Sequence, residues 1–323
     1  MEKTLEKKPL LSRVKGYEML FVYVLMVVVF TILRPAYISA FNIRSILLQT
    51  SFLGIIASGM TMVVLTGGVD MSVGMMAGMA TLSGIWPVVF DGAPLWQGLL
   101  LAFGLALLIG AINGASVAFL GVAPFVATLS TMFLAQGWQY LVSDGGMAIS
   151  YGFPDAYLAM GSGSVLGIPA PVLIYAAVFL ILLAITEFSP AGRYFRGTGL
   201  NQFASELSGV RIRWYTFLSY VICSVLATLF GLVLGASQSY VSPDHGSSFM
   251  IDSLLTVLLG KTLMNGRVSI HATAFGALFL RSFEAGLSMI GLPTTLLQVC
   301  KGILLVAVLL FTGLRQLKGR GKR

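Results

Sequence analysis

Long apolar stretches follow one another along almost the whole of this 323-residue chain, and they constrain its fold more than any other feature. A helix needs about 20 mostly apolar residues to cross the hydrocarbon core of a bilayer. Hydrophobic residues make up 57% of the chain and charged residues only 10%. A water-soluble core could not cover so much apolar surface, so we expect an all-α polytopic membrane protein.

About ten stretches have the length of a membrane span. They are expected at residues 17–33, 50–66, 72–90, 95–118, 123–143, 171–188, 215–241, 249–263, 269–290 and 294–314. The eighth is short, and a half-helix or re-entrant segment is a second interpretation of it. The whole chain is then one transmembrane domain. Outside the spans we expect tails at 1–16 and 315–323, an external loop at 144–170 and a cytoplasmic coupling loop at 189–214.

Basic residues define the expected orientation. Sixteen of the 20 Lys and Arg residues fall in the N-terminal tail, in the segment 192–213, at Lys261 and Arg267, or in the C-terminal tail. Because positively charged loops stay in the cytoplasm, both termini and the segment 192–213 are expected there. This clustering explains the net charge of +8 without nucleic-acid binding.

The segment 192–213 contains a predicted short helix. Asn201 is suited to cap its first turn, and Gly209 is suited to end it in a left-handed conformation. Phe203, Leu207 and Val210 would share one face. The expected coupling helix consists of Asn201, Phe203, Ala204, Glu206, Leu207, Ser208, Gly209 and Val210. Its apolar ridge is suited to a cleft on a cytoplasmic partner; the alternative is a helix that lies on lipid headgroups.

Polar side chains within or at the ends of apolar spans are costly, so they mark a transport pathway or a gate. The candidates are Asp70, Ser72, Asn113, Thr128, Thr131, Gln136 and Asp252. Arg281 and Glu284, three residues apart on one helix face, are expected to neutralise each other near the outer surface. So few charges in the spans disfavour a proton-coupled carrier.

Motifs for catalysis, nucleotide binding or metal binding are incomplete. The Gly-Lys-Thr at 260–262 lacks the glycine that a phosphate-binding loop needs five residues earlier, where Leu255 stands. Ser72 has no matching base, and His245 has no second ligand at metal spacing. Cys223 and Cys300 lie in apolar spans and are expected to be packing residues. We therefore expect neither an enzyme nor a metal site.

Four segments carry a more specific signal. Residues 66–78 read TGGVDMSVGMMAG, and residues 112–137 read INGASVAFLGVAPFVATLSTMFLAQG. Residues 192–210 read GRYFRGTGLNQFASELSGV, and residues 258–278 read LLGKTLMNGRVSIHATAFGAL. In this order they resemble the motifs of the permease subunits of ribose-type ATP-binding-cassette importers. The chain departs from the family pattern at Gln136, Lys261, Asn265 and His271, so Lys261 and Asn265 are further candidates for a gate at the inner mouth.

The resemblance implies a ten-span permease fold with inverted halves, formed by spans two to five and seven to ten. It implies that the chain lies in the bacterial cytoplasmic (inner) membrane. The implied partners are two cytoplasmic ABC ATPase subunits, a periplasmic or lipid-anchored sugar-binding protein and a second permease subunit. ATP and Mg²⁺ would bind the ATPases, and this chain would bind no cofactor. The implied cargo is a monosaccharide or similar small polyol. Alternatives are a permease for branched-chain amino acids or nucleosides, an ion-coupled secondary transporter and a non-transporting membrane scaffold.

Overall fold

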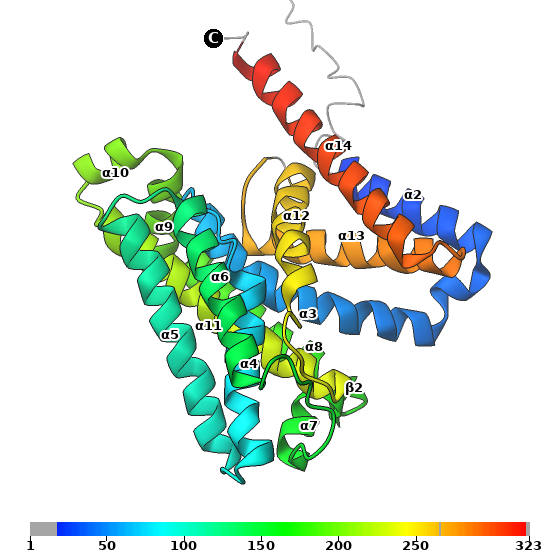
Figure 1. Cartoon of the computed structure of the whole chain (residues 1–323). Helices are drawn as coiled ribbons and strands as arrows, with labels where there is room; N and C mark the ends of the chain where they lie inside the picture. Colours follow the sequence, from blue (N-terminus) through cyan, green and yellow to red (C-terminus); the bar gives the residue numbers. More distant parts are fainter. Residues whose placement is uncertain (1–17, 265, 321–323) are drawn as a thin grey trace, which may run out of the picture.

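The computed structural model describes residues 18–264 and 266–320, and helices dominate it (Figure 1). The first half contains α2 (Glu18–Leu33), the 3₁₀ helix η1 (Pro35–Ile38), α3 (Ala40–Leu65), α4 (Val73–Phe90), α5 (Leu95–Ala118), α6 (Pro124–Val142) and α7 (Asp155–Ser162). The second half contains α8 (Ala170–Phe188), α9 (Pro190–Leu200), α10 (Gln202–Leu207), α11 (Ile212–Gln238), α12 (Ser247–Leu263), α13 (Ile270–Met289) and α14 (Thr294–Arg320).

The expected all-α fold is confirmed in the described residues, apart from one small hairpin. Strands β1 (Ser164–Val165) and β2 (Ile168–Pro169) form an antiparallel hairpin within the external loop expected at 144–170. The two residues that join them, Leu166 and Gly167, both have positive φ, at 52° and 80°. Two successive residues with positive φ are typical of the turn that fits the twist of a two-residue hairpin. The same loop also contains α7, so much of it is folded.

Helix α11 lies at the centre of the molecule and packs against α3, α4, α5 and α7. Close contacts between small residues permit this arrangement. A Cβ at Gly231 of α11 would collide with the carbonyl group of Ala77 in α4, and a Cβ at Gly110 of α5 would meet the backbone of Val221. Glycine at such positions lets two helix backbones approach each other closely.

Five described helices are long and apolar enough to cross a membrane, namely α3, α4, α5, α8 and α11. Most of the apolar segments of α3, α4 and α11 are buried, whereas those of α5 and α8 mostly face outward. Apolar side chains therefore cover both the interior and much of the outer surface. This distribution is that of a multi-pass membrane protein, because lipid is as apolar as the protein core.

Two expected boundaries change by several residues, and the shortest expected span is a complete helix. Helix α3 begins ten residues before the expected start at residue 50, because the Ser39 hydroxyl accepts a hydrogen bond from the backbone N–H of Asn42 at 3.3 Å. Helix α14 continues to Arg320, so the tail expected at 315–323 is helical over its described part. The eighth expected span, which a half-helix could also have explained, is a continuous helix of 17 residues.

The end of the molecule that contains α10 differs in structure from the end that contains α7. Figure 1 shows α9, α10 and the end of α14 toward one side, and α7 with the hairpin toward the opposite side. At the second end, Ile149 pairs with Val241 in a short antiparallel bridge, and Tyr157 of α7 is completely buried. Loops distant in the sequence therefore form one folded layer there.

Candidate functional site

Five of the residues selected from the sequence meet in one hydrogen-bonded group, which we call the inner polar cluster: Asp70, Ser72, Asn113, Thr128 and Thr131. Asp70 and Ser72 lie in the connection between α3 and α4, Asn113 lies near the end of α5, and the threonines lie in the first half of α6. The structure thus brings together three segments that are separate in the sequence.

Hydrogen bonds run through this cluster without interruption. The Ser72 hydroxyl donates to the Asp70 carboxylate at 2.6 Å and accepts from the Asn113 amide at 3.0 Å. The Thr131 hydroxyl donates to the Asn113 Oδ1 at 2.7 Å. No member of the cluster is more than 3% exposed. Buried polar groups need partners, and most of these atoms find them within the cluster, which fixes α5 and α6 to the α3–α4 connection.

The backbone of the α3–α4 connection is held from two further sides. The backbone N–H of Met71 donates to the Thr128 hydroxyl at 3.1 Å, and the Tyr220 hydroxyl of α11 donates to the Val69 carbonyl at 3.3 Å. The connection is therefore fixed to α6 and α11. Any movement of these helices must displace residues 66–72 or break these bonds.

A helix predicted within the segment 192–213 is present as α10, and its capping is confirmed. The Asn201 Oδ1 accepts from the Ala204 N–H at 3.0 Å. Gly209 has φ +78°. Its N–H donates to the Glu206 carbonyl at 2.9 Å, and the Val210 N–H donates to the Ser205 carbonyl at 3.0 Å. These two bonds form a Schellman motif, so the expectation that Val210 belongs to the helix is wrong: the chain turns after Leu207.

Two apolar side chains of α10 face outward. Phe203 and Leu207, four residues apart, are 73% and 75% exposed. Ala204, Glu206 and Ser208 are also exposed, whereas Ser205 is buried. The helix therefore lies on the protein by one side and presents an apolar pair on the other.

Helix α9 connects α10 to the inner polar cluster. A Cβ at Gly197 of α9 would come within 2.9 Å of the Ser205 hydroxyl, and one at Gly199 would collide with the Leu65 carbonyl at the end of α3. The Arg196 guanidinium also donates to the Thr186 carbonyl at 2.6 Å and pairs with Glu187, which fixes α9 to the end of α8. Since Leu65 directly precedes the α3–α4 connection, α9 links α10 to the start of the segment that contains Asp70 and Ser72.

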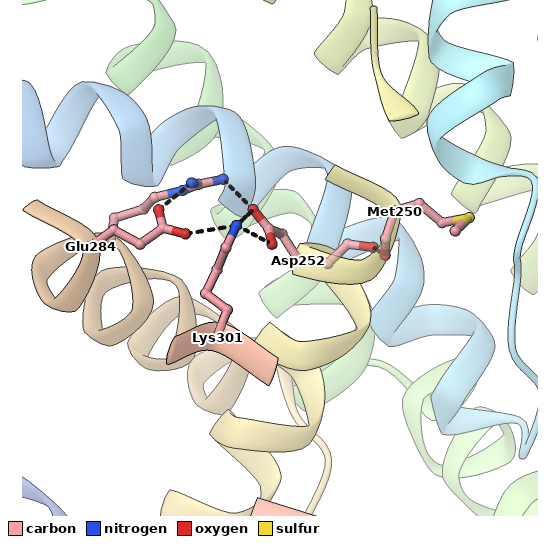
Figure 2. Close-up of polar contacts among 6 residues, drawn as sticks. Met250, Asp252, Glu284 and Lys301 are labelled. Carbon is pink, nitrogen blue, oxygen red and sulfur yellow. Dashed lines mark hydrogen bonds and ion pairs between the residues drawn. The ribbon is translucent and has the colours of Figure 1, made fainter. Parts of the chain in front are cut away.

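A second group, which we call the outer charge cluster, contains Asp252, Arg281, Glu284 and Lys301 from α12, α13 and α14 (Figure 2). Lys301 Nζ lies 2.9 Å and 3.1 Å from the two Asp252 oxygens and 3.0 Å from Glu284 Oε1. Arg281 pairs with Glu284 and, at 3.2 Å, with Asp252. The Arg281 guanidinium carbon also lies 4.9 Å from the centre of the Phe249 ring, a cation–π contact.

The expected neutralisation of Arg281 by Glu284 is confirmed, but it is half of a larger arrangement. Two carboxylates and two cationic groups, with side chains between 7% and 16% exposed, compensate one another and join three helices. Sequence reasoning selected Asp252 and missed Lys301. The signal was available: Thr294, Gln298 and Lys301 are spaced by four and three residues, as on one face of a helix.

Three candidates lie elsewhere. Gln136 donates to the Asp244 carboxylate at 3.2 Å, in the loop between α11 and α12. Lys261 lies half-buried in the last turn of α12, far along the helix from Asp252. Asn265 lies outside the described residues. Among the described residues, no three His, Cys, Asp or Glu side chains are placed to hold a metal ion.

The more important glutamine of α6 is Gln139, which sequence reasoning missed. It is fully buried, donates to the Ala135 carbonyl at 3.1 Å and accepts from the Asp244 N–H at 2.9 Å. Its position was readable from spacing, because Thr128, Thr131, Ala135 and Gln139 repeat at intervals of three and four residues along the buried face.

Several known permeases are similar to this chain in sequence. The chain is 33% identical over 300 residues to the ribose import permease protein of Bacillus subtilis (strain 168), with 88% of this chain and 89% of that protein covered. It is 32% identical over 297 residues to the ribose import permease protein of Escherichia coli (strain K12), with 90% and 91% covered. The galactofuranose transporter permease protein of the same strain is 31% identical over 267 residues, with 82% and 77% covered.

A solved structure shares the fold. It is an inward-facing conformation of a putative metal-chelate type ABC transporter, with a TM-score of 0.51 and 16% sequence identity, and the similarity covers 91% of this chain and 98% of that one. The model of the family described as "Branched-chain amino acid transport system / permease component" matches residues 42–309. This chain belongs to that permease family.

Proposed function

We propose that this chain forms the translocation pathway of an ATP-driven importer for a monosaccharide or similar small polyol. The observation that carries the proposal is the set of contacts from the exposed apolar pair of α10, through α9, to the inner polar cluster. The names of the relatives, ribose and galactofuranose permeases with about one-third of their residues in common with this chain, favour a sugar over an amino acid.

In the proposed mechanism, cytoplasmic ATPase subunits grip Phe203 and Leu207 and move α10 when they close. Because α9 lies directly against the end of α3 at Gly199, this movement reaches residues 66–72. The inner polar cluster then shifts α5 and α6 together, since Asn113 links them. Packed helices change between discrete arrangements rather than deform gradually, so the movement can open one mouth of the pathway and close the other.

The proposed topology has ten spans: α2, α3, α4, α5, α6, α8, α11, α12, α13 and α14. It places both termini and α10 in the cytoplasm. Two halves of inverted topology, α3 to α6 and α11 to α14, are supported by their similar beginnings. Each starts with a long buried helix, of 26 and 27 residues, followed by a shorter one of 18 and 17 residues.

The remaining partners follow from the same proposal. A second permease subunit completes the pathway, and a periplasmic or lipid-anchored binding protein delivers the sugar to the side that contains α7. ATP and Mg²⁺ bind the ATPase subunits, and this chain binds no cofactor. Lys261 and Asn265, with His271, adjust the gate at the inner mouth. The membrane is the bacterial cytoplasmic (inner) membrane.

Reconstitution in proteoliposomes tests the proposal. The chain, its ATPase and its binding protein should take up radiolabelled D-ribose or D-galactose only when ATP is supplied, and unlabelled L-leucine should not compete. Leu207→Asp and Gly209→Pro should abolish association of the ATPase and uptake while the protein still inserts into the membrane. Leu207→Asp acts by placing a charge in the apolar contact, and Gly209→Pro by removing the N–H that closes α10.

Leu166→Asp is the matched control, because Leu166 is 97% exposed and lies in the hairpin at the opposite end. It should leave ATPase association unchanged. Uptake by the purified chain without ATPase or binding protein would instead establish an ion-coupled transporter. Normal association in both α10 variants would remove α10 from the mechanism, and leucine uptake in place of sugar uptake would make the chain an amino-acid permease.

A further inference from the structure

A cavity of about 340 Å³ adjoins the outer charge cluster, between α3, α12, α13 and α14. Besides the four charged residues, its polar lining consists of neutral side chains, all of them exposed: Ser45, Gln49, Ser248, Ser288, Thr294 and Gln298. Phe249 contributes an aromatic wall, and its ring also contacts Arg281.

Helical spacing shows that this lining is organised. Ser45 and Gln49 are four residues apart on α3, and Ser248 and Asp252 are four apart on α12. The polar lining residues of α13 follow one another at intervals of three and four, as do those of α14. Residues three or four apart lie on one face of a helix. Each of the four helices therefore turns a polar stripe toward the same space.

Such polar stripes destabilise a membrane protein unless water or a polar solute forms hydrogen bonds with them. Only 10% of the residues are charged, and the surrounding helix surfaces are apolar. Amide and hydroxyl groups that faced hydrocarbon would lose their hydrogen bonds to water. A cavity of this size with several polar groups in its wall can hold water, and in a transport protein it offers space for a cargo with hydroxyl groups.

The charges indicate what kind of solute fits. The two carboxylates and two cationic groups are already paired with one another at about 3 Å, so the cavity has no uncompensated charge for an anion or a cation. Beside these pairs the cavity offers a set of amides and hydroxyls, which both donate and accept hydrogen bonds. These groups match a neutral molecule with many hydroxyls, and the volume lies within the range of small-molecule sites.

We infer that this cavity is the outer chamber of the translocation pathway, in which one uncharged monosaccharide is bound before the pathway opens inward. The inference rests on the proposed function and adds to it a location, on α3, α12, α13 and α14. The outer charge cluster forms its inner wall and holds the three C-terminal helices around it.

Cysteine labelling tests the chamber in the assembled importer in liposomes. Cys300→Ser provides the background, because Cys300 is only half-buried, whereas Cys223 is buried. In this background, a charged, membrane-impermeant thiosulfonate should modify Ser288→Cys and Gln298→Cys about tenfold faster than Leu296→Cys. Leu296 lies on α14 two residues from Gln298, is 48% exposed and does not line the cavity. D-ribose should slow the labelling of both cavity positions, and D-ribose 5-phosphate should not.

Transport provides a second measurement. Gln49→Leu and Gln298→Leu should each lower D-ribose uptake at saturating binding protein roughly fivefold, because each removes one neutral hydrogen bond to the sugar. Association of the ATPase should stay unchanged in both. The control Leu296→Met should transport as the unsubstituted chain does.

The outcomes separate this inference from the proposed function. If the unsubstituted importer takes up none of the sugars, the proposed function fails. If it takes up D-ribose while the two leucine variants transport normally, or while the cavity cysteines react as slowly as Leu296→Cys or without protection by D-ribose, only the chamber is overturned. Protection by D-ribose 5-phosphate as well would overturn its selectivity for an uncharged cargo.

Discussion

The inner polar cluster and the outer charge cluster both place polar groups inside an apolar protein, but they satisfy them differently. The inner cluster has one carboxylate and uses short side chains, all at most 3% exposed, that hydrogen-bond in a chain. The outer cluster pairs four charged groups of 7% to 16% side-chain exposure beside an open cavity. A single carboxylate that is hydrogen-bonded by short side chains is thus fully buried, whereas the four paired charges lie beside a cavity, where their desolvation costs less.

The largest effect is expected from Lys301→Met in the outer cluster. It leaves the Asp252 and Glu284 carboxylates with Arg281 alone, and an uncompensated buried charge should lower the free energy of unfolding by about 3 kcal/mol. The midpoint of thermal unfolding in detergent measures the loss. Adding Glu284→Gln to the same chain restores the charge balance and should recover most of it. Equal losses in the single and double variants would show that the four charges do not act together.

Asn113→Leu should have the next largest effect, about 2 kcal/mol, because it removes the amide that links Ser72 to Thr131. The matched control is Ser130→Ala on α6, whose exposed hydroxyl donates to the Val126 carbonyl within its own helix at 2.9 Å. This control should change stability by at most about 0.5 kcal/mol. Thermal unfolding again gives the comparison, and a similar response of both variants would mean that the inner cluster is not sealed.

Gly199→Ala tests the contact between α9 and the end of α3, which lies next to the α3–α4 connection of the inner cluster. The added methyl group collides with the Leu65 carbonyl. The backbone shift that removes the collision should lower the free energy of unfolding by about 1 to 2 kcal/mol. Gly104→Ala, in the interior of α5 with open space around it, should instead stabilise the protein by about 0.5 kcal/mol. The two variants should shift the unfolding temperature in opposite directions. An unchanged unfolding temperature in Gly199→Ala would contradict the proposed link between α10 and the cluster.

The smallest effect is expected from Gln136→Leu. Its hydrogen bond to Asp244 is half-buried, and Tyr140 still donates to that carboxylate at 3.0 Å, so the loss should be about 0.5 kcal/mol. Gln139→Leu on the same helix should cost about 2 kcal/mol, since it leaves the Asp244 N–H without its acceptor. The two glutamine variants can be compared in one series of melting curves. Reversal of their order would contradict the assignment of Gln139 as the buried contact.

Local signals predicted the parts of the site that depend on neighbouring residues. Asn201 and Gly209 define α10 from within a few residues, so its start and its end were readable. The members of the inner polar cluster were readable individually, because each is a polar side chain beside an apolar stretch. That they meet could not be read, since the approach of α5 and α6 to residues 66–72 depends on tertiary packing.

The outer cavity was predicted least well. The expected span at 50–66 left Ser45 and Gln49 outside any helix, because the cap at Ser39 was not recognised. Lys301 was not among the candidate residues, since nothing in the local pattern shows that α14 returns to α12 and α13. Helix existence followed from hydropathy, but the partners of buried charges followed only from the arrangement of three helices in space.

The bonds that close α10 at both ends have a consequence for speed and for force. A segment that folds only on contact spends part of its binding energy on ordering itself, whereas α10 is already rigid before any partner arrives. In the proposed mechanism, capture by the ATPase subunits therefore requires no search among conformations of α10. A pull on this preformed helix would displace the segment at its base rather than unwind it, which would let six residues act as a lever.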